Sequence, residues 1–317
     1  MIERFRFLVS TVRKASIVYA CLHDKKFVAN RLLGEILRNT HSIEKGLSIE
    51  NVRLGFGIAK IKEAFGFCCK YENLTGTMNV IPIMMFRDAL VSYLTFHEEN
   101  RFTNTDILEV QEIVNHLSSR LSTTFEHKGG YSKIERKSYT AEEQDTMCRL
   151  FEDRHSVREF AHTPIDENDL NKAIKLAMRC PSACNRQNYR LYIIDKNKFS
   201  LMKGWMDGIG GFANDIEKIL LVTGRMSDFR HTEELQYLIS PTVFASYLTL
   251  SLQIVGIGCC FIQRTIVPSR RNESMKSVLS IPADEQIVCA LGIGNFKESY
   301  KVPISYRLPY NEIVTHL

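Results

Sequence analysis

The sequence predicts an α+β protein in which an all-helical module precedes a mixed or antiparallel sheet with flanking helices. Residues 1–125 carry apolar side chains at three- and four-residue spacing, which is typical of amphipathic helices. After residue 187, short apolar runs alternate with helical patterns but follow no strict strand–helix repeat. Irregular mixing of this kind favours an α+β fold over a doubly wound parallel sheet.

Four helices are expected in the N-terminal module. Arg31–Arg38 and residues 58–68 each carry an apolar stripe. Pro82 suits the first turn of a third helix, where the N–H that proline lacks is not needed. Asn104 or Thr105 can cap a fourth helix by accepting a hydrogen bond from one of its first backbone amides.

His41 and Glu44 stand near the end of the first of these helices, beside Lys45 and Gly46. Two interpretations of this pair stay open. The two side chains could face a substrate, or the segment could be an ordinary helix terminus. The second interpretation is favoured because glycine is common where helices end.

A polar stretch with a Gly-Gly break, residues 126–139, is the best candidate for a linker. A chain of 317 residues is long for a single domain. We therefore expect a helical extension with its linker over residues 1–139 and a second domain over residues 140–317. Thr140 opens a Thr-Ala-Glu-Glu capping pattern, and the helix that it begins should end just before Arg154.

The second domain should contain short strands between helices. A helix is expected over residues 170–178, a long apolar helix from Pro241 to Val255 and a short helix near Glu273–Leu279. Gly256 and Gly258 should end the long helix. Apolar runs predict strands at residues 191–194, 218–223, 259–262 and 286–293.

Composition and charge exclude several classes of protein. The 41 Lys and Arg residues against 36 Asp and Glu residues leave a net charge of +5, interspersed rather than gathered in a basic stripe, which argues against nucleic-acid binding. No window reaches the roughly 18 uninterrupted apolar residues of a membrane span. The first 24 residues carry charges and lack a cleavage site for a signal peptide. We expect them to form an amphipathic helix that packs on its own domain.

Nine cysteines, an odd number, include two adjacent pairs in apolar surroundings. Without a signal peptide, this pattern indicates reduced and mostly buried thiols in a cytoplasmic protein. Cys180 and Cys184 are one residue too far apart for a C-x-x-C motif, and no matching histidine pair follows. No metal site is expected.

The residues that can carry chemistry gather between Phe151 and Tyr189. Arg154, Ser156 and Arg158 alternate along one short segment, and a Pro-Ser-Ala-Cys-Asn-Arg-Gln turn, residues 181–187, follows one helix later. A guanidinium group offers a planar fork of donors that matches phosphate oxygens. The stretch therefore predicts binding of a phosphate-bearing cofactor with a polar edge.

Three segments in order resemble the nitroreductase family. RHSVREF (154–160) followed by PSACNRQ (181–187) is similar to its FMN-binding signature. GIGCCFIQ (256–263) resembles the family's segment beside the flavin ring, and RLPYNEIV (307–314) resembles its C-terminal arginine motif. The first 140 residues, with HSIEKGL, more loosely resemble an extension of nitroreductase-like proteins from polysaccharide biosynthesis clusters.

The resemblance implies an α+β sandwich that dimerises extensively, with FMN held between protomers. It implies that Arg154 and Arg307 hold the flavin phosphate, and that Arg158 stands at the pyrimidine edge of the ring. No side chain is expected to be catalytic, because flavin N5 carries the chemistry, and the turn should reach the cofactor of the partner subunit. The implied cofactor-binding residues are Arg154, His155, Ser156, Arg158, Pro181, Ser182, Ala183, Asn185, Gln187, Cys259, Cys260 and Arg307, with Cys259 and Cys260 acting through backbone amides.

The sequence also departs from the family pattern. Ser305 stands where many relatives have a basic residue, and Asn188-Tyr189 replaces the usual Pro-Trp after Gln187. Asn214 is one candidate for the family's mid-domain ring contact. A separate dinucleotide-binding domain is not expected, because Gly292-Ile-Gly294 comes too late in the chain and Gly208–Gly211 lacks a preceding strand.

The leading functional hypothesis is an FMN-dependent oxidoreductase that transfers a hydride from NAD(P)H through flavin to a small-molecule acceptor in two alternating steps. One alternative is a flavin-dependent dehydrogenase or other tailoring enzyme that acts on a sugar or polysaccharide intermediate. A third possibility is a docking protein whose flavin domain is partly vestigial.

Overall fold

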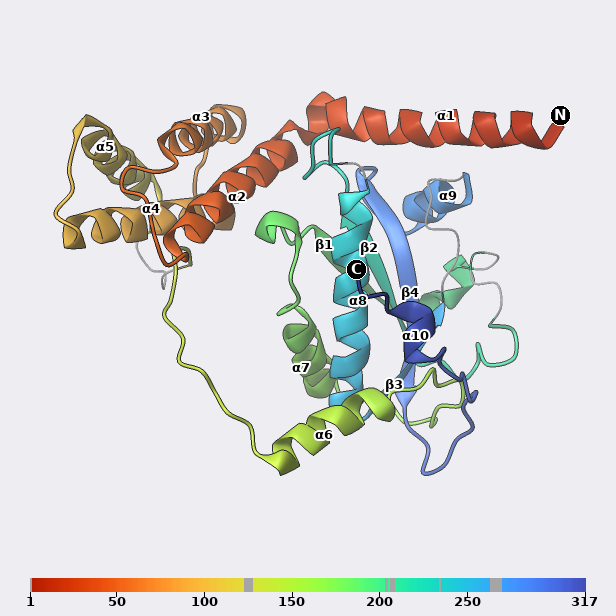
Figure 1. Ribbon diagram of the computed structural model, residues 1–317. Coiled ribbons are helices and arrows are strands. Elements are labelled where there is room, and N and C mark those ends of the chain that lie inside the picture. Colours follow the sequence, from red (N-terminus) through yellow and green to blue (C-terminus); the bar gives the residue numbers. More distant parts are fainter. Residues whose placement is uncertain (1, 123–127, 203–204, 206–208, 234, 263–269) are drawn as a thin grey trace.

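The computed structural model describes residues 2–122, 128–202, 205, 209–233, 235–262 and 270–317. Helices gather in the N-terminal part, and a sheet with flanking helices forms the rest (Figure 1). The predicted α+β fold with a helical N-terminal region is confirmed. Within the described ranges, no helix is both long and apolar enough to cross a bilayer.

The helical module consists of α2 (Val28–Leu47), α3 (Ile58–Thr75), α4 (Ile81–Glu99) and α5 (Thr105–Arg120). Pro82 lies in the first turn of α4, as predicted. Asn104 is the cap of α5, since its side chain accepts a hydrogen bond from the Ile107 amide at 2.9 Å. The four helices enclose one apolar core, whose most deeply buried members include Ile36, Ile61, Ile83, Phe86, Leu90, Tyr93 and Leu117.

Among the residues of helix α1 (Ile2–His23) whose side chains the structure describes, those in the C-terminal half pack on the rest of the chain. Ile17, Val18 and Cys21 join a small cluster with Met226, Phe229 and Tyr237. The earlier turns extend away from the body, and Phe5, Leu8 and Val12 are exposed (Figure 1). The last turns therefore pack on residues of the second predicted domain, which corrects the expectation that this segment packs on its own domain.

The sheet contains β1 (Tyr189–Asp195), β2 (Lys218–Arg225), β3 (Ile257–Ile262) and β4 (Glu285–Asn295) in the order β1-β2-β4-β3. All three pairs of neighbouring strands are antiparallel. The two central strands, β2 and β4, are buried along almost their whole length. Both faces of the sheet are therefore covered.

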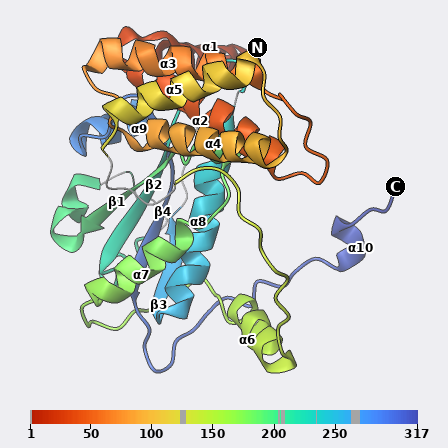
Figure 2. The same ribbon diagram turned by 90° about the vertical axis from the view of Figure 1, so that its left-hand side faces the viewer.

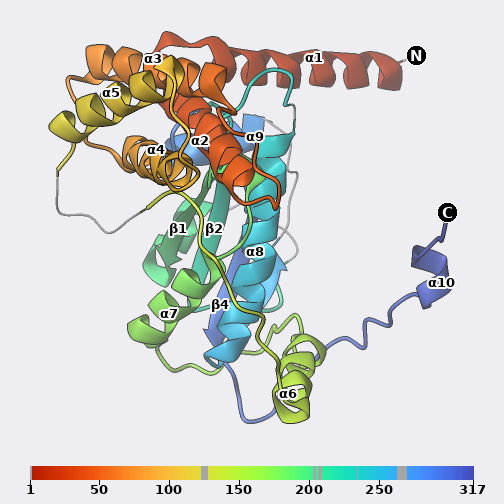
Figure 3. The same cartoon turned by 60° about the vertical axis from the view of Figure 1, so that its left-hand side comes forward.

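Different layers cover the two faces. Helices α7 (Glu167–Ala177) and α8 (Gln236–Ile254) pack on one face, which buries Leu220 and Val222 of β2 (Figure 3). The other face buries Ile219 and Leu221 against α9 (Arg270–Val278) and the irregular segment between β1 and β2, which includes a 3-10 helix over Lys196–Met202. Successive apolar side chains of β2 therefore point to opposite faces and contribute to a different core on each face.

Two further helices stand out from the body. Helix α6 (Ala141–Glu152) begins with the predicted capping box, in which Thr140 and Glu143 exchange hydrogen bonds, yet no residue of α6 is buried. Helix α10 (Tyr310–Ile313) lies on an extended C-terminal segment that projects away from the sheet (Figure 2). Residues 128–140, which follow the helical module, have no regular structure.

Two predicted element boundaries are wrong. Helix α8 begins at Gln236 rather than Pro241. Pro241 has no N–H to donate to the Tyr237 carbonyl, and the side chain of Asn188 donates to that carbonyl instead. Strand β2 continues through Gly224 to Arg225. A Cβ at Gly224 would lie 2.0 Å from the Tyr237 oxygen, so glycine there allows α8 to approach the sheet closely.

The main cores of the two parts are separate, one formed by residues between 36 and 121 and the others by residues between 157 and 293. The small cluster of Cys21 with Met226, Phe229 and Tyr237 contains residues of both parts. The division into domains at residues 139 and 140 stays a prediction.

We expect Leu220→Ala to lower the free energy of unfolding by about 2–5 kcal/mol, because it opens a cavity in a fully buried strand. Urea denaturation followed by circular dichroism measures this change. Leu108→Ala, at a side chain that is 61% exposed on α5, is the control and should change the free energy by less than about 0.5 kcal/mol. Equal losses in the two variants would contradict the assigned burial.

Candidate functional site

The segment Arg154–Phe160 runs beside strand β3. The Val157 amide donates to the Cys259 carbonyl at 2.9 Å, and Ser156 forms a parallel bridge with Cys259. Val157 and Phe160 are buried, whereas Arg158 is exposed and Ser156 half-buried. Burial of Val157 and Phe160 therefore fixes the segment, while the side chains of Ser156 and Arg158 stay accessible to solvent.

Two glycines allow this segment to lie close to the sheet. A Cβ at Gly294 of β4 would lie 2.7 Å from the Phe160 side chain, and one at Gly258 of β3 would lie 3.1 Å from Phe296. The sequence predicted that Gly258 ends the preceding helix, and this prediction is wrong. Gly258 lies inside β3, where the rings of Phe296 and Phe160 occupy the space that a side chain would need. Gly292-Ile-Gly294 is likewise part of a strand and not of a phosphate-binding loop.

The cations of this segment are available for an anion. In the part of the chain that the structure describes, neither Arg154 nor Arg158 forms an ion pair with a carboxylate, and the Ser156 hydroxyl has no hydrogen bond. The Arg158 guanidinium donates to the Ser156 carbonyl at 3.3 Å and lies 5.9 Å from the centre of the Phe212 ring. His155 is half-buried beside them. Two guanidinium groups without a carboxylate partner among the described residues, together with a hydroxyl, fit a phosphate-bearing cofactor.

Cys259 and Cys260 continue the site along β3. Burial raises the pKa of the Cys259 thiol to about 12, and the nearby charge of Arg154 opposes that rise. Burial also raises the pKa of Cys260, with Arg158 as the opposing charge. Both thiols are therefore protonated at neutral pH and poorly nucleophilic.

The Pro181–Gln187 turn is held by its own hydrogen bonds and by α8. The Ser182 hydroxyl accepts from the Gln187 amide at 3.1 Å, and the Ala183 amide donates to the Ser240 hydroxyl at 3.1 Å. Ala183–Asn185 forms a 3-10 turn, in which Cys184 and Asn185 both have a φ of 51°. Tyr189, which follows the turn, stacks on Phe244 with ring centres 4.5 Å apart, so it supplies the packing aromatic at this point.

Within one chain, this turn and the Arg154–Phe160 segment lie at opposite ends of the sheet. Tyr189 pairs with Gly224, which pairs with Gln286, whereas Cys259 pairs with Ile293. Gln286 and Ile293 are seven residues apart along β4, which corresponds to about 23 Å at ~3.3 Å per residue. The predicted site residues therefore do not form one site within a single chain.

Arg307 lies apart from both segments. It is exposed, donates to the carbonyl of Ser305 and forms no ion pair among the described residues. It belongs to the C-terminal segment, which projects away from the sheet (Figures 2 and 3). A single chain therefore does not bring Arg307 to Arg154.

Other candidates take structural positions. His41 Nδ1 lies 3.4 Å from a Glu44 carboxylate oxygen, and the other oxygen accepts from the Gly130 amide at 3.3 Å. The pair thus ties α2 to the predicted linker. The Asn214 carbonyl accepts from Lys196, and Gly208 of the glycine-rich run lies outside the described residues.

Sequence reasoning passed over Arg186, which lies within the Pro181–Gln187 turn. Its side chain is fully buried and forms two hydrogen bonds with Glu233. No local pattern indicates this pair, because its partner lies 47 residues away. The presence of an arginine between Asn185 and Gln187 was the one feature of the sequence that could have drawn attention to this position.

Residues 151–220 match the model of the nitroreductase family. A Streptococcus pyogenes protein named as an NAD(P)H nitroreductase is 36% identical over 58 residues, a stretch that covers 18% of this chain and 29% of that relative. The chain thus spans less than a third of the curated relative. This part of the chain is nitroreductase-like.

Several solved structures are similar at low identity. A Bacillus subtilis nitroreductase has 20% identity and a TM-score of 0.48, over 55% of this chain and 100% of that one. An FMN-dependent nitroreductase from Clostridium difficile has 20% identity and a TM-score of 0.45, over 53% and 98%. A Desulfovibrio desulfuricans nitroreductase in complex with FMN has 14% identity and a TM-score of 0.45, over 54% and 95%.

We expect iodoacetamide to label Cys148 much faster than Cys259 in the folded protein at mildly alkaline pH. Cys148 is exposed on α6, whereas burial of Cys259 keeps its thiol protonated and inaccessible. Peptide mass spectrometry measures both rates, and urea-unfolded protein is the control in which they should converge. Equal rates in the folded protein would show that the Cys259 sulfur is open to reagents.

Proposed function

We propose that this chain, nitroreductase-like over residues 151–220, is an FMN-dependent oxidoreductase that uses NAD(P)H. The observation that carries the proposal is the pair Arg154 and Arg158, which flank the Ser156 hydroxyl beside β3 without a carboxylate partner among the described residues. Phosphate matches such donors well. FMN supplies the hydride-accepting ring when it is bound, and the protein orients and tunes it.

Each residue has a distinct role in this proposal. Arg154 and Ser156 bind the phosphate end, and Arg307 adds a second fork of donors. Arg158 places a fixed positive charge at the pyrimidine edge, where it stabilises negative charge on a reduced ring. Its position near Cys260, one residue further along β3 than the Cys259 that Arg154 approaches, supports this order of contacts.

A homodimer completes the proposed site. The Pro181–Gln187 turn and the Arg154–Phe160 segment lie at opposite ends of the sheet within one chain, so the turn of a second copy is assigned to the cofactor. The C-terminal segment supports this assembly, because its apolar side chains are exposed in the single chain and suit burial on a partner. They are Ile304, Tyr306, Leu308, Tyr310 and Ile313, which are 67–92% exposed.

The acceptor is a small molecule in this proposal, and electrons reach it in a second step after NAD(P)H has been oxidised. Residues 140–317 form the cofactor-binding domain. Dehydrogenation of a sugar intermediate stays an alternative within the same class of cofactor.

Purified protein is expected to show flavin absorbance bands, or to acquire them with added FMN, and the bands should bleach with NADH or NADPH under anaerobic conditions. Arg154→Met should weaken FMN binding by about 10–100-fold, since it removes a charged hydrogen bond worth ~1.5–3 kcal/mol. Fluorescence titration measures the affinity. Arg149→Met is the control, because Arg149 is exposed on α6 and pairs with Asp145. If the wild-type protein does not take up FMN, the proposal is wrong and a docking protein with a partly vestigial flavin domain is favoured instead.

The triple variant Ile304→Ser/Tyr306→Ser/Leu308→Ser should shift the protein from dimer towards monomer, because the exposed apolar contacts of the C-terminal segment are lost. Light scattering coupled to size-exclusion chromatography measures the mass. Leu74→Ser/Leu108→Ser, which changes exposed side chains of the helical module, is the control and should stay dimeric. A wild-type protein that is monomeric at all concentrations would exclude the shared site.

A further inference from the structure

The backbone of the Pro181–Gln187 turn is strained. Cys184, Asn185 and Gln187 have φ values of 51°, 51° and 48°, in the left-handed region that residues with side chains rarely adopt. Asparagine tolerates this region, but cysteine and glutamine do so at a cost. Such a conformation persists only where surrounding contacts fix it, so the turn needs an external anchor.

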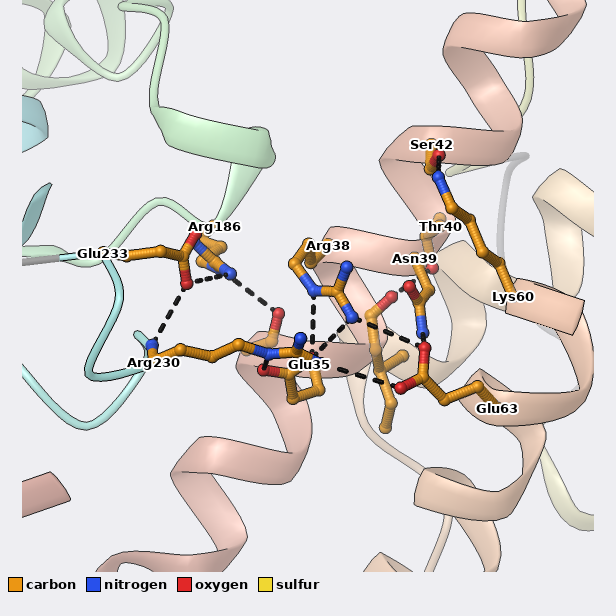
Figure 4. Close-up of polar contacts among 12 residues, drawn as sticks. Glu35, Arg38, Asn39, Thr40, Ser42, Lys60, Glu63, Arg186, Arg230 and Glu233 are labelled. Carbon is orange, nitrogen blue, oxygen red and sulfur yellow. Dashed lines mark hydrogen bonds and ion pairs between the residues drawn. The ribbon is translucent and has the colours of Figure 1, made fainter. Parts of the chain in front are cut away.

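Arg186 supplies that anchor from inside the turn. Its Nη1 and Nη2 donate to the two oxygens of Glu233 at 2.7 and 2.9 Å, and its Nε donates to the Gly34 carbonyl of α2 at 3.3 Å (Figure 4). The guanidinium also lies 4.7 Å from the centre of the Phe229 ring. These contacts fix a residue that lies between two strained neighbours.

Helix α2 holds the other end of the anchor. Glu233 also accepts from the Arg230 amide at 3.1 Å, and the Arg230 side chain forms two hydrogen bonds with Glu35 of α2. Glu35 is half-buried, and the charges of Arg230 and Arg38 outweigh this burial and lower its pKa. Arg38 in turn reaches Glu63 of α3 at 3.4 Å (Figure 4). A row of ion pairs therefore connects the turn to the helical module.

The main chains are also in direct contact here. A Cβ at Gly34 would lie 2.4 Å from the Asp228 carbonyl oxygen, so α2 touches the loop that carries Arg230 and Glu233. Cα atoms of α2 also lie within contact distance of the Ala183–Asn185 turn. The helical module is thus packed against the turn and against the residues that anchor it.

We propose that the helical module fixes the conformation of the Pro181–Gln187 turn, with Arg186 as the positioning residue and Glu35 as its support on α2. This inference rests on the proposed function, in which the turn contacts FMN in the partner subunit. In this proposal the N-terminal extension supports cofactor binding by holding the turn in place, and it does not contact the cofactor itself. Arg186 itself acts through Ser182, Ala183 and Asn185.

Amide hydrogen exchange tests the positioning without any cofactor. In the full-length protein, Glu35→Ala and Arg186→Met should speed exchange at the Ala183, Asn185 and Gln187 amides by about tenfold, which corresponds to ~1.4 kcal/mol of local opening. Arg186→Lys should lie between wild type and Arg186→Met, since it keeps the charge but loses the planar fork. Alanine favours helix, so Glu35→Ala retains α2 even if Arg186→Met does not fold.

The matched control is Lys62→Met, which removes a cation of the helical module that pairs with Asp106 and Glu109 on its far side. It should leave exchange in the turn unchanged. In parallel, fluorescence titration should give FMN affinities about tenfold weaker for Glu35→Ala and unchanged for Lys62→Met, relative to wild type.

The outcomes separate the two proposals. Faster exchange in the turn together with weaker FMN binding supports the inference. If Glu35→Ala and Arg186→Met speed exchange in the turn but the wild type does not bind FMN, the positioning of the turn by the helical module is supported and the proposed function is wrong. Wild-type exchange rates in both Glu35→Ala and Arg186→Met overturn the inference, whatever the wild-type affinity for FMN.

Discussion

A buried guanidinium imposes the strongest constraint on this structure. The Arg186 side chain is fully buried, and a charge withdrawn from water is tolerated only with close partners. Glu233 and the Gly34 carbonyl provide them, which requires the Pro181–Gln187 turn, the loop after β2 and helix α2 to meet at one point. Removing Glu233 would leave the buried Arg186 charge without its carboxylate, a loss that costs about 3–5 kcal/mol in buried pairs. Three segments that are distant in sequence are therefore placed together.

The position of the helical module follows from that meeting point. Helix α2 lies against the loop that contains Asp228, and Asn30 donates to Asp284, the residue before β4. The module thus covers the end of the sheet where the turn lies, while the Arg154–Phe160 segment occupies the other end. Since the sheet separates the two, a cofactor that needs both must be shared between copies of the chain.

Local patterns in the sequence were sufficient for much of the fold. The Thr140 capping box, the Asn104 cap and Pro82 in the first turn of α4 depend on neighbours within four residues, and all three are observed. The start of α8 and the position of Gly258 were mispredicted. Both depend on distant partners, namely the Asn188 amide beside Tyr237 and the rings of Phe160 and Phe296 beside Gly258.

The candidate site divides in the same way. By itself, the sequence determined the alternation of Arg154, Ser156 and Arg158, because a two-residue period is visible along the chain and predicts a common side for them in an extended segment. Only the tertiary structure decided that this side lies beside Cys259, that the Pro181–Gln187 turn lies at the far end of the sheet, and that Arg186 pairs with Glu233. The physical reason is that strand register and the pairing of buried charges join residues distant in the chain, and no local period encodes such partners.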